Sequence, residues 1–292
     1  MGTLNKIPII YIIGAGRSGS TLLDLIMGSH SQIIGVGELS NWFFRKKEQS
    51  RMTCTCGKNI LNCDFWQKVF KNIPQDLKIL DSKLKINQDK INFLFNRKKY
   101  FFAGNREIKF DLKKYLELNY QIYRNILDFS GKKFVLDSSK EMDRAEVLVL
   151  DNRFEMVFVH LVRDGRGTTY SYKRKHGGII SPMMLWVQNN LKAEIFKRRY
   201  PGKTIFLSYE DFCKNPREAI EKILKKVNLS FEPQMMNYRS EVHHQVDGNP
   251  LRIRDDHQEI REDLAWKKEL PLLDKIIFNI LFGWLNLYYH FK

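Results

Sequence analysis

Short apolar runs alternate along this chain with segments in which apolar residues recur at helical spacing. The runs 7–13, 133–136, 155–162 and 203–207 have the composition of strands buried on both faces. Helical patterns occupy 20–29, 38–48, 112–129, 141–150, 166–175, 183–199 and 216–227. The alternation predicts an α/β fold in which helices cover both faces of a central parallel sheet. Ligands of such sheets bind where the strands end, here at the loops after 13, 136 and 162.

A long apolar stretch covers 270–291, but Lys275, Asn279 and Asn286 interrupt it. Because a membrane span needs about 20 consecutive apolar residues, we predict a helix that packs on the core or the surface. Contact with a membrane surface stays open as an alternative. The first apolar run contains Pro8 and continues into a loop, so we interpret it as a core strand rather than a signal peptide and expect a cytoplasmic protein.

The 292 residues, 43% of them hydrophobic, suit a single large domain over 1–292. The formal net charge of +16 favours anionic partners, namely nucleotides, acidic glycans, nucleic acid or an anionic membrane, without choosing among them. Residues 83–114 carry ten Lys or Arg and three acids. We predict a basic helical excursion at about 70–130, which is either a solvated face or a landing surface for an anionic acceptor.

Three of the four cysteines lie close together in the sequence, at Cys54, Cys56 and Cys63, and the fourth is Cys213. Structural zinc sites usually need four ligands, so three cysteines without a nearby fourth indicate zinc only weakly. The alternatives are reduced packing thiols and, in an oxidising compartment, a local disulfide. We therefore expect no metal site.

A phosphate-binding pattern follows the first predicted strand. Three of its residues fit the ATP-binding consensus G-x-x-x-x-G-K-[ST]: Gly14, Gly19 and Thr21. Ser20 stands where that consensus has lysine, and the cation is instead Arg17. Loop amides, hydroxyl groups and the start of a helix together form an anion site. The pattern predicts binding of a phosphate-like group, while the missing lysine argues against ATP chemistry.

A second strand–turn–helix pattern spans 155–174. Arg163 ends the strand, and Ser171 follows eight residues later on the helix, so the two can hold one phosphate from two sides. Asp164 suits the cap of that helix. Two phosphate sites predict a nucleotide with phosphate groups at both ends.

The two patterns together resemble the sulfotransferase superfamily, whose members use 3′-phosphoadenosine 5′-phosphosulfate (PAPS) and share a P-loop-kinase-like three-layer fold. Its 5′-phosphosulfate loop is matched by residues 17–21, and its 3′-phosphate motif by Arg163 and Ser171. Bacterial members often show further short motifs, matched here by Gly37–Glu38, Cys54 to Trp66, Asp137 to Lys140 and Gly248 to Arg252. Residues 70–130 and the C-terminal 25 residues are unmatched, and there we expect acceptor specificity to lie.

The resemblance implies PAPS as donor, 3′-phosphoadenosine 5′-phosphate (PAP) as product, and transfer without a metal. The donor site would comprise Gly16, Arg17, Ser18, Gly19, Ser20, Thr21, Leu22, Arg163, Ser171 and Arg252. Glu38 would be the general base, and Arg17 and Lys140 would stabilise the leaving group. The acceptor would be a hydroxyl or amine of a saccharide or another polar metabolite, small molecule or glycan, and nucleic acid is not expected.

Two other functions remain open on the sequence alone. A P-loop kinase with an altered loop could use Asp137, the acid that ends the run 134–137, to hold magnesium. A non-catalytic polyanion-binding protein could use 83–114. Among the histidines, His160 suits the core, and either His243 or His244 could line the site.

Overall fold

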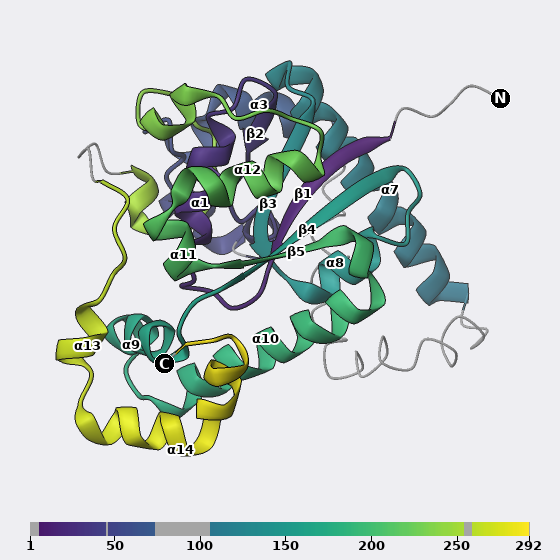
Figure 1. Cartoon of the computed structure of the whole chain (residues 1–292). Helices are drawn as coiled ribbons and strands as arrows, with labels where there is room; N and C mark the ends of the chain where they lie inside the picture. Colours follow the sequence, from purple (N-terminus) through teal and green to yellow (C-terminus); the bar gives the residue numbers. More distant parts are fainter. Residues whose placement is uncertain (1–5, 45, 74–105, 254–258, 292) are drawn as a thin grey trace.

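A computed structural model describes residues 6–44, 46–73, 106–253 and 259–291. Its centre is a sheet of five parallel strands in the order β2-β3-β1-β4-β5 (Figure 1). The strands are β1 (Ile7–Ile13), β2 (Ile33–Gly35), β3 (Phe134–Lys140), β4 (Phe154–Val162) and β5 (Thr204–Ser208). The predicted α/β fold is confirmed. β2 is a short strand that the sequence did not predict, and β3 extends four residues beyond the run expected at 133–136.

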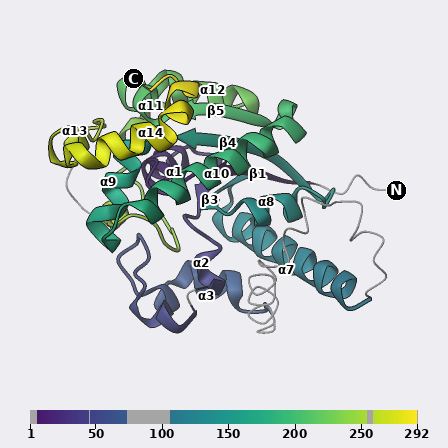
Figure 2. The same cartoon turned by 90° about the horizontal axis from the view of Figure 1, so that it is seen from below.

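Helices cover both faces of the sheet (Figure 2). One face packs against α1 (Ser20–Gly28), α11 (Tyr209–Lys214) and α12 (Pro216–Lys226). The other packs against α3 (Asp64–Phe70), α7 (Arg106–Ser130), α8 (Met142–Leu148) and α10 (Ile180–Arg199). The helix expected at 38–48 is instead the short α2 (Asn41–Phe44) followed by a 3-10 helix, Lys46–Arg51.

The alternation of side-chain direction along β1 explains why helices pack on both faces of the sheet. Ile9 and Tyr11 belong to the core beneath α7, whereas Ile10 and Ile12 belong to the core beneath α1. Successive side chains of a strand point to opposite faces, so an unbroken apolar run is buried on both sides. All these side chains are at most 1% exposed.

The strand register brings the loops of interest to one edge of the sheet. Ile13, the last residue of β1, is paired with Lys140 of β3 and with His160 of β4. Val162 is paired with Ser208 at the end of β5. The segments that follow these strands therefore meet at the carboxyl edge, where ligands of parallel sheets bind.

The C-terminal helices α13 (Ala265–Glu269) and α14 (Leu272–Tyr288) lie beside α9 (Gly165–His176), near this edge (Figure 1). Phe278 and Leu285 of α14 are buried, while Ile280 is 76% exposed. None of the helices in the described ranges has the length and hydrophobicity needed to cross a membrane.

The predicted basic excursion is described only in part. Residues 106–130 form α7, in agreement with the helical pattern at 112–129. Residues 74–105, which hold most of the predicted landing surface, lie outside the described residues. The segments on both sides of this gap contribute strands to the same sheet, and the single-domain organisation over 1–292 stays a prediction.

Candidate active site

The loop between β1 and α1 contains several residues with positive φ angles. Gly14, Arg17 and Gly19 have φ angles of 120°, 64° and 89°, and the Ser18 hydroxyl donates to the Ala15 carbonyl at 2.9 Å. A Cβ atom at Gly19 would lie 2.5 Å from the ring of Tyr209, and one at Gly16 would overlap the Tyr172 hydroxyl. Glycine is therefore needed at positions 16 and 19 on packing grounds.

The start of α1 is covered by a segment from the C-terminal third of the chain. Ser20 and Thr21 are buried, and the Asn249 amide donates to Thr21 Oγ1 at 3.1 Å. A Cβ atom at Gly248 would lie 3.1 Å from the same oxygen, so this segment approaches the helix closely. Leu22 packs in the core beneath α1, which leaves its backbone as the part that could face a ligand.

Arg163 lies directly against the loop. One of its Nη atoms donates to the Arg17 carbonyl at 3.4 Å, across 146 residues of sequence. The other donates to the Asp263 carbonyl at 2.8 Å and lies 3.2 Å from the Asp263 carboxylate. The guanidinium stacks over the Tyr209 ring at 4.7 Å and the side chain is 5% exposed, so its position is tightly fixed.

Helix α9 places two further side chains beside these groups. Ser171 follows Gly167 by one helical turn and therefore lies on the same side of α9. That side meets Arg163, because a Cβ atom at Gly167 would lie 3.1 Å from Arg163 Nε. The next residue, Tyr172, has its ring 5.8 Å from the Arg17 guanidinium.

Tyr172 also links the loop electrostatically to Glu38. Burial raises the pKa of Tyr172, while the charge of Arg17 lowers it and that of Glu38 raises it further. Both charged side chains are thus close enough to act on one hydroxyl group. The sequence gave no indication that Tyr172 belongs to the site.

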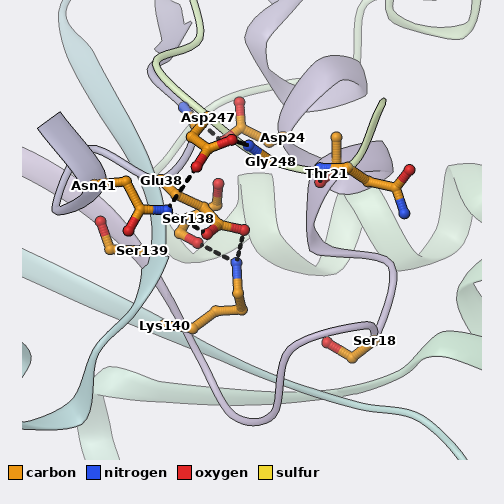
Figure 3. Close-up of polar contacts among 12 residues, drawn as sticks. Ser18, Thr21, Asp24, Glu38, Asn41, Ser138, Ser139, Lys140, Asp247 and Gly248 are labelled. Atoms are coloured by element: carbon orange, nitrogen blue, oxygen red, sulfur yellow. Dashed lines mark hydrogen bonds and ion pairs between the residues drawn. The ribbon is translucent and has the colours of Figure 1, made fainter. Parts of the chain in front are cut away.

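Glu38 and Lys140 form an ion pair beside the loop (Figure 3). Lys140 Nζ lies 2.7 Å from Glu38 Oε1 and donates to the Ser138 carbonyl at 2.7 Å. The Asn41 side-chain amide donates to Glu38 Oε2 at 2.9 Å and to the Asp247 carboxylate at 3.0 Å. The side chains of Glu38 and Lys140 are 25% and 11% exposed, so the pair retains access to solvent.

Lys140 has a φ angle of 64°, as does Arg17. Non-glycine residues rarely adopt this conformation, and it concentrates at functional sites. At Lys140 this conformation occurs where the pairing of β1 with β3 shifts register between Tyr11 and Ile13. Both cations predicted for catalysis thus occupy positions that the surrounding structure must hold in place.

Asp24 of α1 anchors the turn that carries Glu38. The Gly37 amide donates to one of its oxygens at 3.1 Å, and the Gln245 side-chain amide donates to the other. Burial raises the pKa of Asp24 to about 7. The sequence gave no indication of this residue, because its partners come from two distant segments.

Arg252 lies near the start of α1, where it is 8% exposed. It donates to the Thr53 carbonyl at 2.7 Å, and its Cδ atom lies 3.4 Å from where a Cβ at Gly248 would be. Burial lowers the pKa of Arg252, while the charge of Asp247 raises it. Arg252 Nε is buried without a hydrogen-bond partner among the described residues, so a donor is available there.

Asp137, which the sequence suggested as a possible magnesium ligand, has other partners. Asp137 is fully buried, accepts a hydrogen bond from the Tyr123 hydroxyl at 2.6 Å and lies 3.7 Å from Arg144. These partners belong to α7 and α8, so its side chain is engaged in the interior. This arrangement does not favour a magnesium site.

The histidines have separate surroundings. His160 is buried, 3.1 Å from the Asn190 side-chain oxygen and 3.4 Å from Glu194, as expected for a core residue. His243 lies 2.7 Å from the Tyr238 carbonyl. His244 lies beside the cysteines rather than beside the phosphate loop.

The N-terminal part of the chain, residues 8–71, matches the model of the sulfotransferase family. The match covers less than a quarter of the chain, so it is a similarity of this segment to the family. The sulfotransferase domain of the Synechococcus PCC 7002 olefin synthase superposes with a TM-score of 0.50 at 20% identity, covering 96% of this chain and 95% of that one. The sulfotransferase domain from the curacin biosynthetic pathway gives a TM-score of 0.56 at 19% identity, covering 95% and 98%.

At these identities the two structures establish a common fold. A comparison with curated proteins gives no match. The family match ends at residue 71, so the remaining site residues of this chain rest on the geometry described above. The similarity to the sulfotransferase family supports a transferase.

Proposed function

We propose that this protein transfers the sulfuryl group of PAPS to a hydroxyl or amine of a saccharide or another polar metabolite. The observation that carries the proposal is the contact between Arg163 and the Arg17 carbonyl at 3.4 Å. The two motifs that resemble the 3′-phosphate site and the 5′-phosphosulfate loop of sulfotransferases thus lie against each other, which supports the proposal. A donor with phosphate groups at both ends requires both motifs at one site.

The charges of the cleft suit such a donor. Four cations lie beside the loop or its covering segment: Arg17, Lys140, Arg163 and Arg252. Arg252 Nε has no hydrogen-bond partner among the residues that the structure describes. In the proposed role, the loop amides with Ser18, Ser20 and Thr21 hold the 5′ group. Arg163 and Ser171 hold the 3′-phosphate, and Arg252 closes over the bound nucleotide.

Glu38 is proposed as the general base. The donor supplies an activated sulfuryl group: a bond forms between the acceptor oxygen and sulfur while the bond from sulfur to the 5′-phosphate oxygen breaks. Glu38 accepts the proton that the acceptor hydroxyl loses. Lys140 and Asn41 each occupy one lone pair of its carboxylate, which has about four acceptor positions. Acceptor capacity therefore remains for the substrate.

Arg17 and Lys140 are proposed to stabilise the charge that develops on the leaving oxygen. Both are held in place before the reaction, by the loop backbone and by the end of β3. Fixed charges of this kind lower the barrier because they need no reorganisation during the reaction.

Calorimetry with PAP and with ATP tests the donor assignment. We expect PAP to bind and the Arg163→Ala variant to lose at least about 100-fold in PAP affinity, because a charged, bidentate contact is removed. Arg217→Ala is the matched control, because Arg217 is 72% exposed and pairs with Glu221 on α12. Binding of ATP without binding of PAP would overturn the proposal. Screening of hydroxyl and amine acceptors with labelled PAPS then identifies the acceptor class.

A further inference from the structure

Four side chains with metal-binding atoms meet next to the segment that covers α1. Cys54, Cys56, Cys63 and His244 each offer one ligand atom, and all four atoms lie within 4.8 Å of one another. Cys54 and Cys63 are fully buried. The sequence indicated zinc only weakly because a fourth ligand was missing, and His244 supplies it from 181 residues beyond Cys63.

The spacing of these atoms fits a tetrahedral zinc site. With Zn–S bonds of about 2.3 Å and Zn–N bonds of about 2.0 Å, tetrahedral geometry requires S···S distances of about 3.8 Å and S···N distances of about 3.5 Å. The Cys56 and Cys63 sulfur atoms are 3.7 Å apart. His244 Nδ1 lies 3.8 Å from the Cys54 sulfur and 3.4 Å from that of Cys63.

The chain around the cysteines is shaped independently of any ion. Thr53 and Asn59 form an antiparallel bridge, and the Cys54 amide donates to the Lys58 carbonyl at 2.9 Å. Gly57 makes the intervening turn with a φ angle of 86°. Cys63 then caps the start of α3. A tight hairpin and a helix start thus present three sulfur atoms to one point.

His244 is held toward that point from the other side. Its ring stacks on Phe65 with centroids 4.9 Å apart and an interplanar angle of 15°. The amide of Gln245 donates to Thr55 Oγ1 at 2.6 Å, which ties the two segments next to the ligands. The ring nitrogen Nδ1 is the atom that faces the sulfur atoms.

We propose that Cys54, Cys56, Cys63 and His244 bind one structural Zn²⁺ ion. Three sulfur ligands and one imidazole fill a tetrahedral shell, so this site has no open position for catalysis. Its consequence lies in the neighbouring segment. Asp247 and Arg252 follow His244 on that segment, and Arg252 donates to the carbonyl of Thr53, next to Cys54. The ion would therefore fix the segment that covers the start of α1.

A disulfide explains these positions less well. A disulfide brings two sulfur atoms to about 2.05 Å, whereas those of Cys56 and Cys63 are 3.7 Å apart. It would also use two of the four groups and leave the approach of Cys54 to His244 unexplained. The convergence of all four atoms is the feature that a metal ion accounts for.

The test is the metal content of the purified full-length protein, measured by plasma mass spectrometry with thiols kept reduced. We expect about one zinc ion per chain and a loss of at least 80% of it in Cys63→Ser and in His244→Ala. Cys213→Ser is the matched control, because it removes a buried thiol of α11 outside the cluster and should retain the ion. Replacement by Co²⁺ should give the intense absorption of a tetrahedral cobalt–thiolate centre.

His244→Cys keeps the test decisive if the other variants do not fold, since four thiolates also bind zinc. This variant should retain the ion. A wild-type chain that holds no zinc and takes up no Co²⁺, equal metal content in Cys63→Ser and Cys213→Ser, or a Cys56–Cys63 disulfide found by peptide mapping would overturn the proposal. Metal content is measured without a substrate, so the result is independent of the sulfuryl-transfer assignment.

Discussion

Two carboxylate–cation pairs lie close to the end of β3, and they differ in burial. The side chains of Asp137 and Arg144 are 0% and 4% exposed, and tyrosine hydroxyls of α7 surround them. Those of Glu38 and Lys140 are 25% and 11% exposed and lie beside the loop between β1 and α1. β3 contributes one residue to each pair, so three positions along one strand separate an interior pair from one that solvent can reach.

Burial decides what each pair can do. The Asp137–Arg144 pair is already desolvated, and its partners are fixed by packing. Loss of one member would leave an uncompensated charge in the interior. The Glu38–Lys140 pair is partly hydrated, so its members can exchange one partner for another at low energetic cost. The proposed role of Glu38 as a proton acceptor needs this freedom.

The largest expected effect is on stability, in Asp137→Asn. We expect this substitution to lower the free energy of unfolding by about 3–5 kcal/mol, because the charge of Arg144 remains buried. Urea denaturation measures the difference. Glu38→Gln is the matched substitution in the other pair, and it should cost less than about 1 kcal/mol. Equal losses of unfolding free energy in the two variants would contradict the expected difference between the two pairs.

Glu38→Gln should instead act on transfer. The amide cannot accept the acceptor proton, so we expect the rate to fall by about 100-fold or more. PAP affinity should stay within about twofold of wild type, because the proposed contacts of Glu38 are to the acceptor. Steady-state transfer and calorimetry measure the two quantities, with Glu221→Gln on α12 as control. An equal fall in rate and affinity would indicate a structural role.

Lys140→Met sharpens the comparison within the partly exposed pair. Loss of one preorganised cation should lower the rate by about 100-fold, at the low end of the effect of Glu38→Gln. The double variant tests whether the pair acts as a unit. We expect it to lose less than the product of the two single effects, because neighbouring groups on one reaction path are not additive. Strict additivity would argue against joint action.

Asp24 is a further buried carboxylate, and its hydrogen-bond donors among the described residues are uncharged. Burial raises the pKa of Asp24 to about 7, so the folded protein retains a proton that the unfolded chain releases above about pH 4. Stability should therefore fall as pH rises from about 4 to about 7, by about 1 kcal/mol per pH unit from this group. Asp24→Asn should lack this contribution in urea denaturation measured at pH 5, 6 and 7. If the stability of Asp24→Asn fell with pH as steeply as that of wild type, this expectation would be contradicted.

The sequence predicted those parts of the structure that local patterns determine. The strands, the loop at 14–21 and the helix of Ser171 depend on apolar periodicity and on short motifs, and the structure contains them. β2 is only three residues long, which is too short for a recognisable pattern. The extension of β3 to Lys140 follows from pairing with β1 rather than from its own polar sequence.

The site residues that sequence reasoning missed are those whose role depends on tertiary contacts. Asp247 and Asn41 take part because they meet across 206 residues. His244 was considered for the phosphate site, whereas its ring faces the cysteines. No local pattern marks such residues, because the partner that gives each its role lies on a distant segment.

The position of β1 at the centre of the sheet has a consequence for the way the protein is made. β1 leaves the ribosome long before its neighbours in the sheet, which begin at Phe134 and Phe154. Contacts this distant in sequence close slowly, because the entropy of a long loop is lost before they form. During synthesis, the apolar residues 7–13 therefore stay without a strand partner until β3 has been made. The nascent chain that ends before β3 is consequently the stage at which protection by a chaperone matters most.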